Sequence, residues 1–218
     1  MIPRYLSLLV CMFCLCAAAG AHAQATSTDT GFEAGDIMVR LRLVGIIPNH
    51  GGTPISPVGG NFDNANIATP EIDLSYFFTR RIAVEAELGI FQDRITAVNT
   101  ALGTVPIGTV DAAPLVVVGQ YHLLPDARIN PYIGVGFAVV PYFNAQPAGG
   151  LVQQLSVETE AGPVFELGAD IRIVGPWYAN LDVKKLVLPA QASANNGMLT
   201  SSGQVNPWII GGGIGYRF

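Results

Sequence analysis

Charged side chains spaced two residues apart recur within otherwise apolar segments of this chain. Arg40 and Arg42 occur in IMVRLRLV, and Glu85 and Glu87 occur in IAVEAELGI. If such charges share an enclosed space they must pair with one another, because an isolated buried charge is very costly. The candidate set is Arg40, Arg42, Glu85, Glu87, Glu166, Asp170, Arg172, Asp182, Lys184 and Arg217.

Catalytic and metal chemistry find little support in the same residues. Hydrolysis or acyl transfer needs a nucleophile, a base and an acid held together. His50 lies in the glycine-rich stretch NHGG, and His122 lies in QYHLL with no serine adjacent to it. Two distant histidines give no metal-ligand spacing, and the glycine-rich runs lack the Lys-Ser/Thr of a phosphate loop. The sequence therefore predicts no enzyme, no metal and no cofactor.

The elements that would position the charges are strands, because apolar and polar residues alternate with a period of two. In Ile37–Val44, Leu41 and Leu43 share one face, whereas Arg40 and Arg42 share the other; a helix would mix the two sets. Seven further segments alternate in the same way. They are Glu71–Phe78, Ile82–Ile90, Leu115–Leu123, Pro131–Val140, Pro163–Ile173, Trp177–Leu186 and Pro207–Phe218.

The N-terminal residues 1–23 have the three parts of a secretory signal peptide. Arg4 supplies the positive charge, Leu6–Ala19 is the apolar region, and Ala21–Ala23 is the cleavage pattern. A membrane anchor and a lipoprotein are less favoured alternatives, because the apolar run is short and each cysteine follows a large residue. All three cysteines of the chain lie in this cleaved segment: Cys11, Cys14 and Cys16.

Composition narrows the remaining classes. Hydrophobic residues make up 50% of the 218 residues, charged residues only 12%, and the net charge is −5. A mildly acidic chain lacks the basic face that nucleic acids require. After the signal peptide there is no apolar run of about 18 residues, so a spanning helix is not expected.

An exported, apolar chain with alternating strands indicates a transmembrane β-barrel. The connections alternate in length: short ones lie near 79–81 and 174–176, a medium one lies near 124–130, and long ones lie near 48–69, 92–111, 142–159 and 189–206. The prediction is an all-β, eight-stranded antiparallel transmembrane β-barrel with short periplasmic turns and long extracellular loops. Residues 24–35 would be an N-terminal periplasmic segment and residues 36–218 the barrel, in the outer membrane of a Gram-negative bacterium.

The chain resembles the OmpW family of outer-membrane proteins. The resemblance is carried by GDIMVRLR, PYIGVGFAVVPYF, ELGADIRI, GPWYANLDVKKL and above all the ending NPWIIGGGIGYRF. It implies a barrel with a hydrophobic channel that admits small hydrophobic molecules, as in related alkane-uptake proteins. A terminal Phe218 with Tyr216 two residues before it looks like the signature read by the outer-membrane assembly machinery.

An eight-stranded barrel is too narrow for a wide water pore. The inward charges would form either an ionic plug that makes the barrel rigid or a polar floor that turns a solute sideways into the membrane. Pro114 and Pro163 are candidates for the lateral opening, because proline weakens a strand ladder. Candidate channel-lining residues are Val44, Ile46, Phe91, Val116, Val140 and Tyr142.

The expected function is passive uptake of small hydrophobic solutes with lateral release, and there are two alternatives to it. A structural or adhesive barrel would use its long loops as the functional surface, without transport. A soluble lipocalin-like barrel is disfavoured, because here the charges point inward and the apolar residues face the surrounding lipid.

The alternation also places Gly211, Gly213 and Gly215 on the inner face of the last strand, where they would make room for Arg40 and Arg42. Gly213→Leu should therefore destabilise the barrel more than Gly212→Leu.

Overall fold

The structure is a computed structural model that describes residues 31–48, 53–56, 59–150 and 152–218. The expected signal peptide and its cysteines, residues 24–30 and His50 lie outside the described residues. Within them, no helix is long and apolar enough to cross a membrane.

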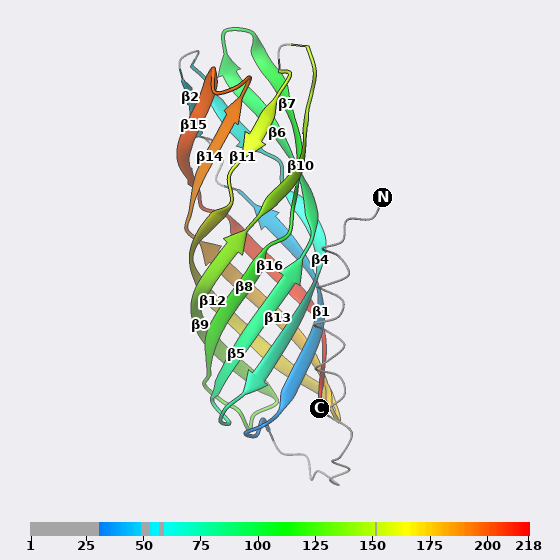
Figure 1. Ribbon diagram of the computed structural model, residues 1–218. Coiled ribbons are helices and arrows are strands. Elements are labelled where there is room, and N and C mark those ends of the chain that lie inside the picture. The colour runs from blue at the N-terminus through cyan, green and yellow to red at the C-terminus, as the bar shows by residue number, and fades with distance from the viewer. Residues whose placement is uncertain (1–30, 49–52, 57–58, 151) are drawn as a thin grey trace.

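Eight antiparallel strands close into a barrel, as the alternation predicts (Figure 1). Each strand of the barrel overlaps one of the eight predicted segments. Short turns join the strands at one end, here called the turn end, and the other is the loop end. In order around the barrel the strands are β1 (Ile37–Ile47), β16 (Trp208–Arg217), β13 (Trp177–Leu186), β12 (Glu160–Val174), β9 (Ile129–Val140), β8 (Leu115–His122), β5 (Ile82–Gly89) and β4 (Ile67–Phe77).

The long connections continue as a second sheet stacked on the loop end of the barrel (Figure 1). Asn99, Asn195 and Asn196 adopt positive φ angles in or beside its tight turns, a conformation that asparagine tolerates better than most residues. The sheet runs from β10 to β11 as an open array. Its strands, in order, are β10 (Tyr142–Pro147), β7 (Gly103–Ala112), β6 (Phe91–Thr100), β3 (Asn61–Asn64), β2 (Thr53–Ser56), β15 (Leu199–Val205), β14 (Leu188–Ala194) and β11 (Leu155–Val157).

The barrel turns its apolar side chains outward and its charged ones inward. On β1, Leu41 and Leu43 are 61% and 65% exposed, whereas Arg40 and Arg42 are buried. Each of the other seven barrel strands also has exposed apolar side chains, which is the pattern of a wall that faces lipid.

Strand β16 closes the barrel beside β1 and fits the two arginines closely. Arg40 pairs with Gly215 and Arg42 with Gly213 in the register. A Cβ atom at Gly211 would lie 2.4 Å from Nη2 of Arg42, and one at Gly215 would lie 2.9 Å from Cγ of Arg40. The inner-face glycines therefore leave the space that the arginine side chains fill.

A layered lumen with an apolar pocket above an ionic cluster

The middle of the barrel is filled by a network of buried ion pairs, here called the ionic cluster. Arg40 on β1 binds Asp170 through two hydrogen bonds of 3.0 and 2.8 Å and contacts Glu85 at 2.6 Å. Arg42 contacts Asp73 at 2.9 Å and Asp182 at 2.7 Å. The planar guanidinium suits such two-point recognition of carboxylates.

Lys184 on β13 is the third cation of the ionic cluster. Its ammonium lies 2.9 Å from Glu87 and 3.2 Å from Glu166, and it also contacts Asp182. Among the described residues, two groups of three carboxylates come close enough to share a metal ion, one of them Glu85, Glu87 and Glu166. Because Lys184 lies against all three of these carboxylates, its ammonium supplies positive charge where a cation would otherwise bind.

The structure brings eight of the ten predicted floor residues together in this cluster, and it adds others. Glu71 and Asp73 lie on the predicted inner face of β4 and join the contacts of Arg42. Arg172 and Arg217 lie apart, half-buried near the turn end, where Arg217 donates a 2.6 Å hydrogen bond to the carbonyl of Gly31. Gln120 and Asn180 complete the network as buried hydrogen-bond donors to Glu166 and Asp170.

Below the ionic cluster, an aromatic stopper fills the turn end. Phe32 precedes β1 and is 1% exposed. Its ring stacks on Phe77 with centroids 4.2 Å apart and on Tyr178 at 5.1 Å, and it meets His122 edge-on at 5.5 Å. Part of segment 24–35, expected to be an N-terminal periplasmic segment, therefore packs inside the turn end of the barrel.

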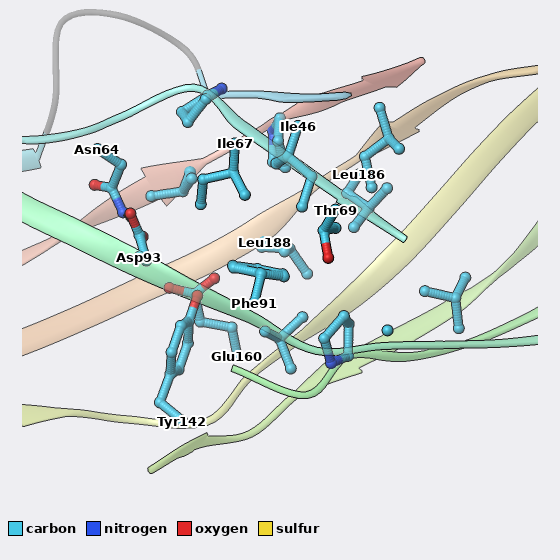
Figure 2. A pocket seen from close by; sticks show the side chains of 18 of the residues that line it. Ile46, Asn64, Ile67, Thr69, Phe91, Asp93, Tyr142, Glu160, Leu186 and Leu188 are labelled. Carbon is cyan, nitrogen blue, oxygen red and sulfur yellow. The ribbon is translucent and has the colours of Figure 1, made fainter. Parts of the chain in front are cut away.

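Above the ionic cluster lies an apolar cavity, here called the neck pocket (Figure 2). Its volume is about 60 Å³, which makes it a constriction rather than a chamber. Five of the six predicted lining residues line it, and Val44 belongs to the buried cluster of apolar side chains against which they pack. The five are Ile46, Phe91, Val116, Val140 and Tyr142.

Two further cavities continue from the neck pocket into the second sheet. The next one, of about 30 Å³, shares Asn64, Asp93, Tyr142 and Glu160 with the neck pocket. The outermost one, of about 330 Å³, shares Phe62 with that middle cavity and has an almost wholly apolar lining. The three cavities thus form a row from the loop end down to the ionic cluster.

The wall beside the neck pocket has a break in its ladder. Strand β3 pairs with β6 as far as Asn64 with Ile95, and β4 pairs with β5 only from Glu71 with Gly89. Between these pairs, residues 65–70 and 90–94 share no ladder pairing. A hollow in this break, here called the wall gap, is lined by Ala65, Asn66, Ile67, Gln92 and Arg94.

The wall gap adjoins both the neck pocket and the apolar outer surface. Ile67 lines the neck pocket and the wall gap together. Outward side chains at this level include Leu43 and Ile90, which are 65% and 61% exposed. Of the two prolines proposed for a lateral opening, Pro114 lines the neck pocket, whereas Pro163 is exposed on the outside of β12.

Comparisons with known proteins agree with this architecture. The sequence model of the OmpW family matches residues 33–218. An uncharacterized outer-membrane protein, y4mB of Sinorhizobium fredii, is 32% identical over 183 residues, which are 83% of this chain and 79% of that protein. The dibenzothiophene metabolism operon protein PahQ of Pseudomonas aeruginosa is 27% identical over 73% of this chain and 76% of its own.

The fold also matches a solved structure. The crystal structure of the outer membrane protein OprG from Pseudomonas aeruginosa superposes with a TM-score of 0.80, at 19% identity, over 86% of this chain and 98% of that one. The closed barrel, the outward apolar belt and the match over nearly the whole described chain lead to one conclusion. This is an outer-membrane protein, and it belongs to the OmpW family.

Proposed function

We propose that this barrel is a passive, non-enzymatic conduit that takes small hydrophobic molecules from outside the cell to the outer membrane. The observation that carries the proposal is the row of cavities, which begins in the apolar hollow of the second sheet and ends on the ionic cluster. A solute could shed water in the outer hollow and remain in apolar surroundings for most of the way. The name of the relative PahQ, which refers to dibenzothiophene, supports an apolar aromatic as one kind of solute.

The end of the route is the wall gap rather than the periplasm. Straight passage would require a solute to separate the buried ion pairs of Arg40 and Arg42 and then displace the Phe32 ring. Sideways passage crosses a place without ladder pairing, next to outward apolar side chains. The exit that we propose therefore lies between β4 and β6, with Pro114 at its inner side.

Two features of the turn end support insertion and assembly in the membrane. Tyr216 lies between Trp177 and Phe218, with ring centroids 5.1 and 4.7 Å away. Aromatic residues at this level suit the interface between lipid and water. Phe218 is 71% exposed and so remains available to the assembly machinery, the second partner that we propose beside lipid.

The test is transfer of a labelled apolar solute into the bilayer of vesicles whose outer leaflet contains lipopolysaccharide. Naphthalene should enter faster with the protein than without it, and glucose should not. Ile67→Trp would place a bulky side chain between the neck pocket and the wall gap, and it should slow naphthalene transfer.

The matched control is Ile72→Trp, on the same strand but facing lipid. It should leave the transfer rate unchanged. Equal rates with and without the protein would remove the transport proposal and favour an adhesive or structural barrel. An unchanged rate with Ile67→Trp would place the exit elsewhere than the wall gap.

A further inference from the structure

Four polar side chains interrupt the apolar row of cavities at the smallest of the three. Asn64, Asp93, Tyr142 and Glu160, here called the polar ring, line both the 30 Å³ cavity and the neck pocket. Figure 2 shows their polar tips gathered on one side of the neck pocket, across from the side chains of Ile46 and Leu186. They come from four different strands, β3, β6, β10 and β12.

The two carboxyl groups of the polar ring retain free hydrogen-bonding capacity. Asn64 donates to one oxygen of Asp93, and Tyr142 hydrogen-bonds Glu160. Oδ1 of Asp93 and Oε2 of Glu160 are buried and have no hydrogen-bond partner among the described residues, although each side chain lines the cavities. Both residues are only 5% exposed.

No cation within the described residues forms an ion pair with Asp93 or Glu160, in contrast to the ionic cluster below. Buried carboxyl oxygens without donors are costly. A solute that brings its own donor would relieve that cost, whereas a solute that brings a second anion would add to it.

We infer that the polar ring selects among hydrophobic solutes by their head group, favouring amphiphiles with a hydrogen-bond-donating or cationic end and rejecting anionic ones. The apolar hollow above and the neck pocket below would accept the hydrocarbon part, and Asp93 and Glu160 would bind an ammonium or hydroxyl group. This inference rests on the proposed route and adds the class of solute that the route prefers.

The experiment compares four labelled eight-carbon solutes in the same lipopolysaccharide-containing vesicles at neutral pH: octylamine, 1-octanol, octane and octanoate. Protein-dependent transfer of octylamine should exceed that of octanoate by about tenfold or more, the change expected from one charge-assisted hydrogen bond. The double variant Asp93→Asn with Glu160→Gln keeps the shape and size of the ring. It should bring the ratio of octylamine to octanoate close to one while leaving octane transfer unchanged.

Asp111→Asn is the matched control, because Asp111 is a carboxylate of the same sheet that already accepts hydrogen bonds from Gln92 and Asn144. It should leave the ratio unchanged. If the double variant still transfers octane and keeps the octylamine-to-octanoate ratio of the unmodified protein, selection by the polar ring is wrong. The proposed conduit would then remain intact. Loss of protein-dependent octane transfer from the unmodified protein would instead overturn the conduit on which the selection depends.

Discussion

The fit of β16 against β1 makes a quantitative prediction about two adjacent glycines. A Cβ atom at Gly213 would lie 2.1 Å from the backbone oxygen of Leu41 and 2.7 Å from Cα of Arg42. A Cβ atom at Gly212 would lie 2.9 Å from Cδ2 of Leu181, the flexible end of a side chain that is 59% exposed. The first clash can be relieved only by moving backbone, whereas the second is relieved by a rotation.

The magnitude follows from a subtraction between the two alanine variants. Replacing either glycine restricts the unfolded chain to a similar degree, which favours folding by about 0.4–1 kcal/mol in both. Gly213→Ala adds an overpacking cost of roughly 1–3 kcal/mol, because strand β16 must move away from Arg42. Gly213→Ala should therefore be less stable than Gly212→Ala by about 1–3 kcal/mol, and the gap should widen for the two leucine variants.

Urea unfolding in lipid vesicles can measure this difference by tryptophan fluorescence, since Trp177 and Trp208 both lie on the outer face of the barrel. The electrophoretic shift on heating offers a second readout of the folded barrel. Equal midpoints for the two alanine variants would refute the argument that inner-face glycines accommodate the arginines. A lower midpoint for Gly212→Ala would reverse the inferred orientation of β16.

Two further substitutions test the closed part of the lumen. Phe32→Ala removes the centre of the aromatic stopper and should lower the free energy of unfolding by roughly 3–5 kcal/mol. Its control is Phe78→Ala, because the Phe78 ring is 57% exposed on the outer face. The control should have a smaller effect in the same urea titration. Lys184→Met leaves Glu87, Glu166 and Asp182 without their shared cation and should cost about 3–5 kcal/mol. Lys185→Met is its control, because Lys185 is a half-buried outer-face residue that contacts the Trp208 ring. An equal loss of unfolding free energy in the two variants would argue against the ionic cluster as a stabilising unit.

The barrel strands were predictable because two different environments act on alternate residues of each one. Lipid requires apolar groups such as Leu41 and Leu43 outside, and the narrow lumen collects polar groups such as Arg40 and Arg42. The second sheet gives a weaker signal. Phe62 lies in the four-residue strand β3, and on β6 the charged Asp93 shares the buried face with Ile95 and Ala97. Besides the hairpins β2–β3, β6–β7 and β14–β15, its strands pair with segments that are distant in the sequence, so their register depends on contacts that periodicity does not reveal.

The site residues that the sequence predicted lie on or next to alternating strands, whereas the missed ones mostly lie outside them. The lining residues of the neck pocket lie at or near the ends of predicted barrel strands, where alternation still indicates which way a side chain points. Asp73 already lies on the predicted inner face of Glu71–Phe78, so alternation alone could have added it to the ionic cluster. Asp93 and Glu160 lie within or next to segments expected to be loops, so alternation assigned them no direction. Phe32 precedes the first alternating segment, and no local pattern marks it as buried.

In the conduit that we propose, the direction of solute movement would follow from the order of these layers. Each methylene group that stays out of water contributes about 0.8 kcal/mol, and this gain is similar in the neck pocket and in the lipid beyond the wall gap. Movement toward the turn end would lose this favourable free energy, because the next layer contains Arg42 and Lys184 with their carboxylates. Separating even one such buried pair costs about 3–5 kcal/mol, and an apolar solute offers no hydrogen bonds in return. On the route that we propose, the ionic cluster therefore makes the lateral path through the wall gap lower in free energy than a path to the periplasm.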